Sequence, residues 1–123
     1  MDILVTNNPL AKEAFAGKVR VDFLETDISG VFLHVRDLIH KGHKLLTHPL
    51  TGSVKPNETL YKSVLVTELP DKTDFMSVGI IEDSIQTVVK FSPKSITDEF
   101  KIDMQTVDLS LIRSALDKNI LGG

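Results

Sequence analysis

Short strand patterns alternate with longer helical patterns in the first half of this 123-residue chain, and this order restricts the fold more than any other feature. Residues 3–5 form a continuous apolar run, which is typical of a strand that is buried on both faces. Residues 9–16 have the composition of a helix that ends at Gly17. Residues 18–24 alternate between polar and apolar side chains, which predicts a half-exposed strand at the edge of a sheet.

The same alternation continues along the chain. Residues 28–41 carry apolar side chains at helical spacing, and residues 44–47 and 63–67 have the patterns of a third and a fourth strand. Strands that alternate with helices of this length are typical of parallel sheets with right-handed crossovers. We therefore predict an α/β fold, a small three-layer sandwich with helices on both faces of a mostly parallel four-stranded sheet. The expected strand order is 2-1-3-4, within a single domain over residues 1–123.

The second half of the chain is acidic and helical. Apolar spacing predicts a helix over about residues 75–88, residues 97–99 have the composition of a helix start, and residues 109–118 predict a short final helix. Residues 68–108 hold nine acidic and four basic side chains, a net charge of −5. Such a segment is typically a solvated surface, and the alternative is a docking surface for a basic partner.

Composition excludes several classes of protein. The net charge of −3 disfavours nucleic-acid binding, and without cysteine the chain has no disulfide, no thiol nucleophile and no thiolate metal ligand. No apolar stretch approaches the ~18 residues of a membrane span, and the first residues do not have the pattern of a secretory signal. We expect a cytoplasmic protein that uses no cofactor and binds neither membranes nor nucleic acid.

Polar residues that follow the predicted strands are the candidate binding residues. In an open parallel sheet, ligands bind in the crevice beyond the carboxyl ends of the strands, where the strand order reverses. The segments after the first and third predicted strands both face this crevice, and the second of them carries a net positive charge, which suits a small anionic ligand. The candidate residues are Thr6, Asn7, Asn8, Thr47, His48, Gly52, Ser53, Lys55, Asn57, Tyr61 and Lys62.

His48 is the strongest candidate for chemistry among these residues. It follows the third predicted strand, so its imidazole can act at the crevice as an acid, a base or a hydrogen-bond donor. We expect the other three histidines, His34, His40 and His43, at the surface near the end of a helix. Because their spacing does not bring together the three or four ligands that zinc requires, we expect no metal site.

A family resemblance rests on two segments. The first is Thr6-Asn7-Asn8-Pro9. The second is Val35-Arg36-Asp37-x-x-His40-x-Gly42-His43-x-Leu45-Leu46-Thr47-His48-Pro49-Leu50-x-Gly52-Ser53-x-Lys55-Pro56-Asn57-x-Thr59-x-Tyr61-Lys62-Ser63. Together they resemble the GrdX family, small proteins encoded beside the glycine, sarcosine and betaine reductase components of amino-acid-fermenting anaerobes. The likeness covers residues 1–67, with Leu60 where we expect proline, and no motif of the acidic half matches.

The resemblance implies a biological context and no mechanism. These reductases rely on selenocysteine and cysteine chemistry, and this chain has neither residue. It therefore looks like an accessory or regulatory protein of the reductase system, and no catalytic residues can be carried over from the family.

Three functions are open. In the first, the chain binds a small anionic metabolite, such as an amino-acid carboxylate or an acyl phosphate, at the carboxyl ends of the strands. In the second, it docks on reductase subunits through its acidic C-terminal helices and helps to assemble them. In the third, it is an enzyme that uses His48 as an acid or base on the same ligand. An exposed sheet edge is also compatible with a homodimer.

Overall fold

The computed structural model describes residues 1–50, 60–89 and 97–122. Its centre is a three-stranded mixed sheet in the order β2-β1-β3, formed by β1 (Ile3–Thr6), β2 (Arg20–Phe23) and β3 (Ser63–Val66). β1 lies in the middle, parallel to β2 and antiparallel to β3. β2 is a half-exposed edge strand, which confirms the prediction from its alternating pattern.

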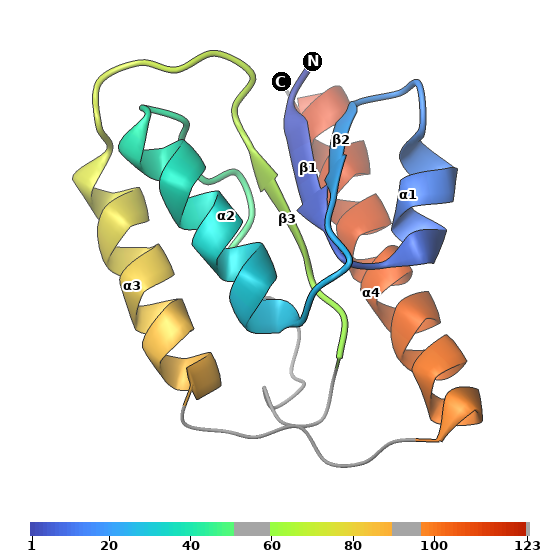
Figure 1. The fold of residues 1–123 in the computed structure, drawn as a ribbon. Helices are drawn as coiled ribbons and strands as arrows, with labels where there is room; N and C mark the ends of the chain where they lie inside the picture. Colours follow the sequence, from blue (N-terminus) through green and yellow to red (C-terminus); the bar gives the residue numbers. More distant parts are fainter. Residues whose placement is uncertain (51–59, 90–96, 123) are drawn as a thin grey trace.

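Four helices cover the two faces of this sheet (Figure 1). They are α1 (Pro9–Phe15), α2 (Ile28–His40), α3 (Phe75–Val89) and α4 (Asp98–Gly122). α2 packs on one face, with α3 along its outer side, whereas α1 and α4 pack on the other face. The α/β architecture with helices on both faces is therefore as predicted.

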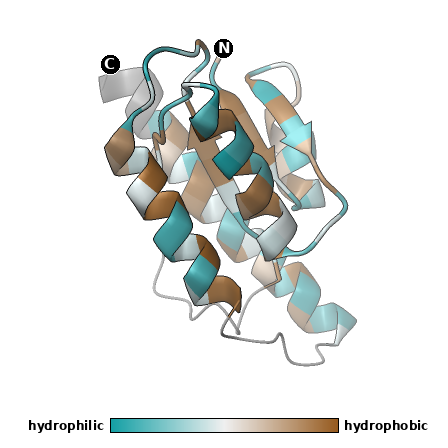
Figure 2. Cartoon of the chain, turned by 60° about the vertical axis from the view of Figure 1, so that its left-hand side comes forward, coloured by the Kyte–Doolittle hydropathy of each residue, from teal (hydrophilic) through white to brown (hydrophobic). Residues whose placement is uncertain are grey.

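Alternation along the strands divides the core between these two helical layers. In β1, Ile3 and Val5 face α2 and α3, whereas Leu4 faces α1 and α4. β3 repeats the arrangement, with Leu65 on the side of α4 and its two valines on the side of α2. Figure 2 shows these strands as a hydrophobic band behind the helices. The continuous apolar runs of the sequence therefore correspond to strands covered on both faces.

The prediction of a mostly parallel four-stranded sheet is wrong. Residues 44–47, predicted as the third strand, pair with the sheet only through a single antiparallel bridge between Leu45 and Val66. The hydroxyl of Thr47 accepts the amide hydrogen of Leu65 at 3.0 Å, and so takes a donor that a regular ladder would give to a backbone carbonyl. Side-chain hydroxyls that compete for the backbone in this way interrupt regular pairing.

The position of β3 also differs from the prediction, whereas its direction, which the sequence left open, is antiparallel to β1. β3 is the predicted fourth strand, and it lies beside β1, in the place expected for residues 44–47. All of its residues are buried although β3 is an outer strand, because helices cover both faces of the sheet and residues 44–47, which alternate between exposed and half-buried, lie along its other edge. Because β3 runs antiparallel to β1, its first residue meets the last residue of β1.

The helices agree with the sequence patterns except near the C-terminus. α2 and α3 are confirmed to within one residue at each end. The predicted short helix over residues 109–118 is part of α4, which begins near the predicted helix start at residues 97–99. The first turns of α4 are mostly exposed and have no single apolar stripe, so the apolar pattern indicated only the later part. None of the helices among the described residues is long and apolar enough to cross a membrane.

Candidate functional site

A buried polar cluster lies where the carboxyl end of β1 meets the amino end of β3. Thr6 and Ser63 are paired across these strands, and their hydroxyl oxygens are 2.7 Å apart. Ser63 Oγ donates to Asp108 Oδ2 of α4 at 2.6 Å, and Thr6 Oγ1 accepts from the backbone N–H of Asn8 at 3.0 Å. These two bonds set the direction of the chain: the Thr6 hydroxyl donates to Ser63, and Ser63 donates to the carboxylate of Asp108.

Asn8 joins this cluster to two helices. Its Oδ1 accepts from the amide of Leu10 at 3.0 Å and so caps α1. Its Nδ2 donates to Asp108 Oδ2 and to the backbone oxygen of Gln105, both at 2.9 Å. Since these bonds use both amide hydrogens and the oxygen of the side chain, Asn8 holds α4 against α1.

Asn7 has a similar role on the other side of the strand. Its Nδ2 donates to the backbone oxygens of Thr26 and Leu60, each at 2.9 Å, and its Oδ1 accepts from the amide of Lys62 at 3.0 Å. Asn7 therefore ties the segments that precede α2 and β3 to the end of β1. Asn7 and Asn8, both predicted to bind a ligand, position the residues around the cluster.

Two side chains of opposite charge lie beside the cluster and are buried. Lys62 exposes 4% of its surface and Asp108 exposes 6%. Burial lowers the pKa of Lys62, and the negative charge of Asp108 offsets part of this effect. Burial raises the pKa of Asp108, against the hydrogen bonds from Ser63 and Asn8 and the charge of Lys62. Desolvation therefore disfavours both charges, and each charge favours the other.

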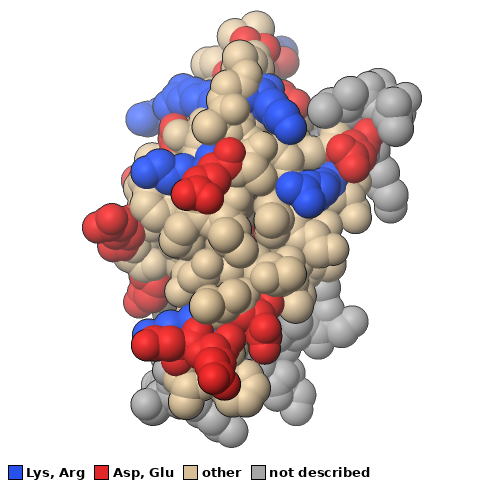
Figure 3. Space-filling model, turned by 90° about the vertical axis from the view of Figure 1, so that its right-hand side faces the viewer, with Lys and Arg blue, Asp and Glu red and all other residues tan. Residues whose placement is uncertain are grey.

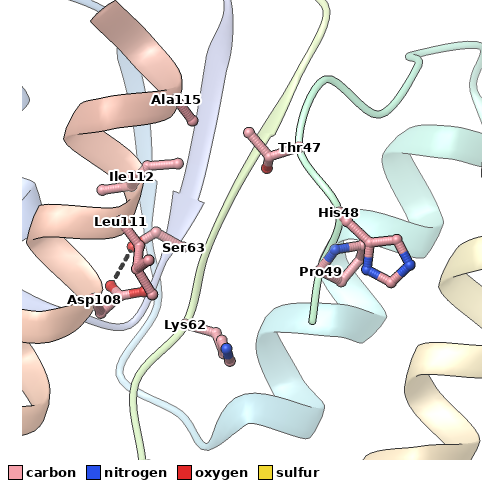
Figure 4. Close-up of a pocket in the computed structure, with 9 residues that line it drawn as sticks. All are labelled: Thr47, His48, Pro49, Lys62, Ser63, Asp108, Leu111, Ile112 and Ala115. Atoms are coloured by element: carbon pink, nitrogen blue, oxygen red, sulfur yellow. Dashed lines mark hydrogen bonds between the residues drawn. The ribbon is translucent and has the colours of Figure 1, made fainter. Parts of the chain in front are cut away.

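These residues line a small hollow between α4 and the segment that follows α2 (Figure 4). Asp108 and Ser63 lie on one side of it, and Thr47 and His48 lie on the other. The hollow measures about 280 Å³ including the part open to solvent, and the centre of a water molecule can occupy about 20 Å³ of it. The lining residues are Thr47, His48, Pro49, Lys62, Ser63, Asp108, Leu111, Ile112 and Ala115.

His48 lies at the rim of this hollow. Its side chain is exposed, and its Nδ1 accepts from the amide of Leu50 at 3.1 Å. In Figure 4 the imidazole lies on the side of its own segment that is away from Asp108 and Ser63. Nδ1 thus serves the local turn, and the acid or base role of His48 stays a prediction.

Comparison with known protein families identifies the chain. The model of the GrdX-like protein family matches residues 3–117. The chain belongs to the GrdX-like family. This match confirms the resemblance found in residues 1–67 and extends it through most of α4, so that it includes every lining residue of the hollow. Searches of curated proteins and of solved structures found no significant match.

Asp108 is the residue of this GrdX-like protein that the sequence analysis missed. The sequence pattern that could have identified it is helical spacing. Asp108, Ile112 and Leu116 fall at i, i+4 and i+8 and are all buried on the inner face of α4. An acidic side chain in line with buried apolar residues is unusual and indicates a special role. The predicted final helix began one residue later, at Leu109, so this alignment was not recognised.

The other predicted site residues of the GrdX-like chain fall into three groups. Gly52, Ser53, Lys55 and Asn57 lie outside the described residues. Tyr61 is half-buried next to Lys62. The structure brings the remaining six to the cluster or the hollow: Thr6, Asn7, Asn8, Thr47, His48 and Lys62.

Two of the other histidines, His34 and His43, make hydrogen bonds within the fold of this GrdX-like protein. His34 Nε2 lies 2.9 Å from Asp22 Oδ2 on β2, and His43 Nδ1 lies 2.8 Å from the backbone oxygen of Thr67. His43 is buried, unlike the surface position that we expected. In the part of the chain that the structure describes, no three metal-ligating side chains converge.

Proposed function

We propose that this protein is an accessory or regulatory protein of the glycine, sarcosine and betaine reductase system, and that it binds a small charged metabolite. The binding site is the hollow beside α4, where Lys62 attracts an anionic group of the ligand. One observation carries this proposal: Lys62 and Asp108 are both buried and both line the same hollow. The link to the reductases comes from the GrdX family, whose members are encoded beside reductase components.

Burial of two charged side chains supports a ligand site. Lysine and aspartate are rarely buried, because each loses favourable hydration, and a pair of this kind adds little net stability to a fold. Charged groups with shifted pKa values in a cleft are more often found where a protein binds or transforms a ligand. Lys62 and Asp108 meet this description, with burial acting on the pKa of both.

A second function is supported by the exposed surface of α4. Phe100, Ile102 and Val107 expose 61%, 60% and 48% of their surface, and Asp98 and Glu99 stand beside them at the start of the helix. In Figure 3 acidic side chains gather at the lower end of the face that α1 and α4 present. Apolar side chains with an acidic border suit a partner with an apolar and basic surface. The second candidate is therefore docking on a basic reductase subunit.

Thermal melting in the presence of small ligands tests the first proposal. The panel consists of glycine, sarcosine, betaine, acetate, acetyl phosphate, phosphate and nucleotides, at equal ionic strength. A ligand at 100 times its Kd adds about 2.7 kcal/mol of stability, an increase in Tm on the order of 10 °C for a domain of this size. We expect such a shift for at least one small anionic or zwitterionic compound.

Paired variants assign the binding to the hollow. Lys62→Met is expected to abolish the ligand-induced increase in Tm. His48→Ala, at the rim of the hollow, is expected to reduce this increase. His40→Ala, an exposed histidine at the end of α2, is the matched control and keeps the full shift. A panel without any shift would refute ligand binding. Capture of a reductase subunit by the wild-type chain, lost on Phe100→Asp, would then favour the docking function.

A further inference from the structure

We infer that the outer edge of β2 is an interface between two copies of this chain, in which β2 pairs with β2 of the second copy in antiparallel orientation. The two three-stranded sheets then join into one continuous sheet around a two-fold axis. This inference is independent of the ligand proposed above. It rests on the open edge of β2, on the direction of its backbone groups and on the order of its two charges.

β2 is an outer strand with one side open to pairing. β1 lies on its inner side, and no other strand among the described residues pairs with its outer side (Figure 1). The opposite edge of the sheet, at β3, is bordered by residues 44–47 through the bridge between Leu45 and Val66. An edge strand of this kind presents N–H and C=O groups that a strand of another chain can bind.

The backbone groups that point outward from β2 belong to Val21 and Phe23. The N–H of Arg20 donates to the backbone oxygen of Asp2 at 3.1 Å and so faces the side of β1. Because successive residues of a strand turn their backbone groups to opposite sides, those of Val21 and Phe23 face away from β1. In an antiparallel pair centred on Val21, the Val21 residues of the two copies exchange two hydrogen bonds.

The two charged side chains of β2 favour this register over its neighbours. Arg20 and Asp22 are two residues apart and lie on the same face of the strand. With the axis at Val21, Arg20 of each copy lies opposite Asp22 of the other, in a pair whose side chains are close because it is not hydrogen-bonded. A shift of the second copy by two residues would set Arg20 against Arg20 or Asp22 against Asp22, and like charges directly opposite each other are destabilising.

Both charged groups have hydrogen-bonding capacity for the second copy. Within the chain, Arg20 Nε donates to Asp22 Oδ1 at 3.1 Å, and His34 Nε2 lies 2.9 Å from Asp22 Oδ2. A carboxylate has about four acceptor sites and a guanidinium five N–H donors, so each group can add a bond across the axis. The Arg20 side chain, 59% exposed, is accessible to the second copy. Charges on an edge strand usually deter pairing, whereas this order of charges admits an antiparallel copy.

The other face of β2 brings apolar side chains together in the same register. Val19 and Val21 pack against the core under α1 and α4 and are only half-buried, as is Phe23. Val21 lies opposite Val21 of the second copy, and Val19 lies opposite Phe23. Aromatic and β-branched pairs across strands stabilise a sheet. The hollow beside α4 includes Ser63 of β3, on the other side of β1, so pairing through β2 does not involve it.

Sedimentation velocity of the full chain over a series of concentrations tests this interface. We expect a reversible equilibrium between monomer and dimer. Arg20→Asp sets two pairs of negative charges across the axis, and Asp22→Arg sets two pairs of positive charges, so each variant is expected to raise the dimer Kd at least about tenfold. An equimolar mixture of the two variants pairs opposite charges again and is expected to form a heterodimer. Lys72→Asp makes the same change of charge at an exposed position before α3 and should keep the wild-type Kd.

Disulfide formation tests the register and does not depend on the charge variants. The chain has no cysteine, so Arg20→Cys and Asp22→Cys each introduce a single thiol. Opposite residues of a pair that is not hydrogen-bonded have Cα atoms about 4.5 Å apart, a separation that a disulfide can span. We expect a mixture of the two variants to form a disulfide-linked heterodimer faster than either variant links to itself.

Three results would overturn the inference. The first is a wild-type chain that stays monomeric up to about 1 mM. The second is a dimer whose Kd is the same for Arg20→Asp as for the wild type, which would place the contact on another surface. The third is a pair of cysteine variants that do not link to each other faster than to themselves. Each of these results would leave the proposed ligand binding standing.

Discussion

The hydroxyl of Ser63 is the central link of the buried hydrogen-bond chain, because it accepts from Thr6 and donates to Asp108. Ser63→Ala removes the shortest bond to a carboxylate that has little access to water. Leaving a buried polar group without a partner costs about 1–3 kcal/mol, and we expect the free energy of unfolding in urea to fall by that amount. Ser114→Ala, at an exposed position of α4, is the control. A loss at Ser63 no larger than at Ser114 would contradict this role.

The carboxyl group of Asp108 makes stability depend on pH, because burial raises its pKa above the usual value of 3.8. Below that value the group is protonated in both the folded and the unfolded protein, and its burial carries no charge penalty. As the pH rises toward the higher folded-state pKa, the unfolded chain ionises first, so this group progressively destabilises the fold. The penalty is complete above the folded-state pKa.

Asp108→Asn removes this titration. We expect the stability of the variant, measured relative to the wild type by urea unfolding, to increase as the pH rises from about 4 to 7. Other titrating groups contribute to both proteins and largely cancel in the difference. Asp117→Asn removes an exposed carboxylate from the same helix. It measures how much of the change in relative stability comes from the loss of one negative charge alone. A relative stability that falls with rising pH would mean that the ionised form of Asp108 is favoured by folding.

At the residue scale, the structure brings several of the predicted residues together, but the sequence did not predict the bonds that each side chain makes. Thr6, Asn7 and Asn8 lie at the cluster, but the side-chain amides of both asparagines make their hydrogen bonds within the protein. Those bonds join residues as far as 100 positions apart, such as Asn8 and Asp108. Partners so distant in the chain are set by tertiary packing, and no local pattern indicates them.

At the element scale, substitutions of Gly42 and Gly79 form a matched pair that tests the backbone geometry of the helices. Gly42, which ends α2, has a φ of 107°, and a Cβ there would collide with the backbone oxygen of Asp71. Gly79 lies within α3 and has open space where a Cβ would be. We expect Gly42→Ala to destabilise the protein by about 1–3 kcal/mol from backbone strain alone. Gly79→Ala should stabilise it by about 0.5–1 kcal/mol.

Thermal melting of the two variants measures both effects in the same protein. A decrease in Tm for Gly42→Ala together with an increase for Gly79→Ala is the expected result. Equal changes of the same sign would contradict the geometry assigned to the turn after α2. Gly42 was predicted from the sequence as the residue that ends this helix, and its positive φ agrees with that role.

Elements defined by a local pattern were predictable, and their neighbours in the sheet were not. α2 follows its apolar stripe almost to the residue. Residues 44–47 have the composition of a strand, yet Thr47 directs its hydroxyl to the backbone of β3 and the segment forms one bridge only. β3, which is fully buried, pairs with β1 in place of residues 44–47, and that segment lies along its other edge. Whether an apolar run pairs in the interior or at an edge depends on what covers it, which the run does not encode.

The whole molecule consists of two helical layers that share three strands. Leu4 and Leu65 belong to the core under α1 and α4, while their neighbours in β1 and β3 belong to the core under α2 and α3. α4 follows the other elements in sequence order, and its Ile112 and Leu116 pack in the same core as Leu4 of β1. The sequence predicted helices on both faces, but the contribution of α4, including Asp108, required knowledge of where that helix packs.

Because β1 and β3 contribute side chains to both cores, we expect the two helical layers to unfold together. Ile112→Ala leaves a cavity under α4, and such a change costs about 2–5 kcal/mol. If the strands couple the layers, the most protected amides of α2 exchange with deuterium faster by the same factor as those of α4, although α2 does not contact Ile112 in the same core. Hydrogen exchange followed by mass spectrometry measures both helices in one sample.

Val107→Ala, at a half-exposed position of α4, is the control and should leave both exchange rates almost unchanged. Acceleration confined to α1 and α4 would mean that each helical layer opens independently, and the expectation of a single domain over residues 1–123 would then be wrong. Equal acceleration in α2 and α4 would mean that the hollow beside α4 is stabilised by the entire core. A ligand bound there would in that case protect amides in both layers, including those of α2 on the far side of the sheet.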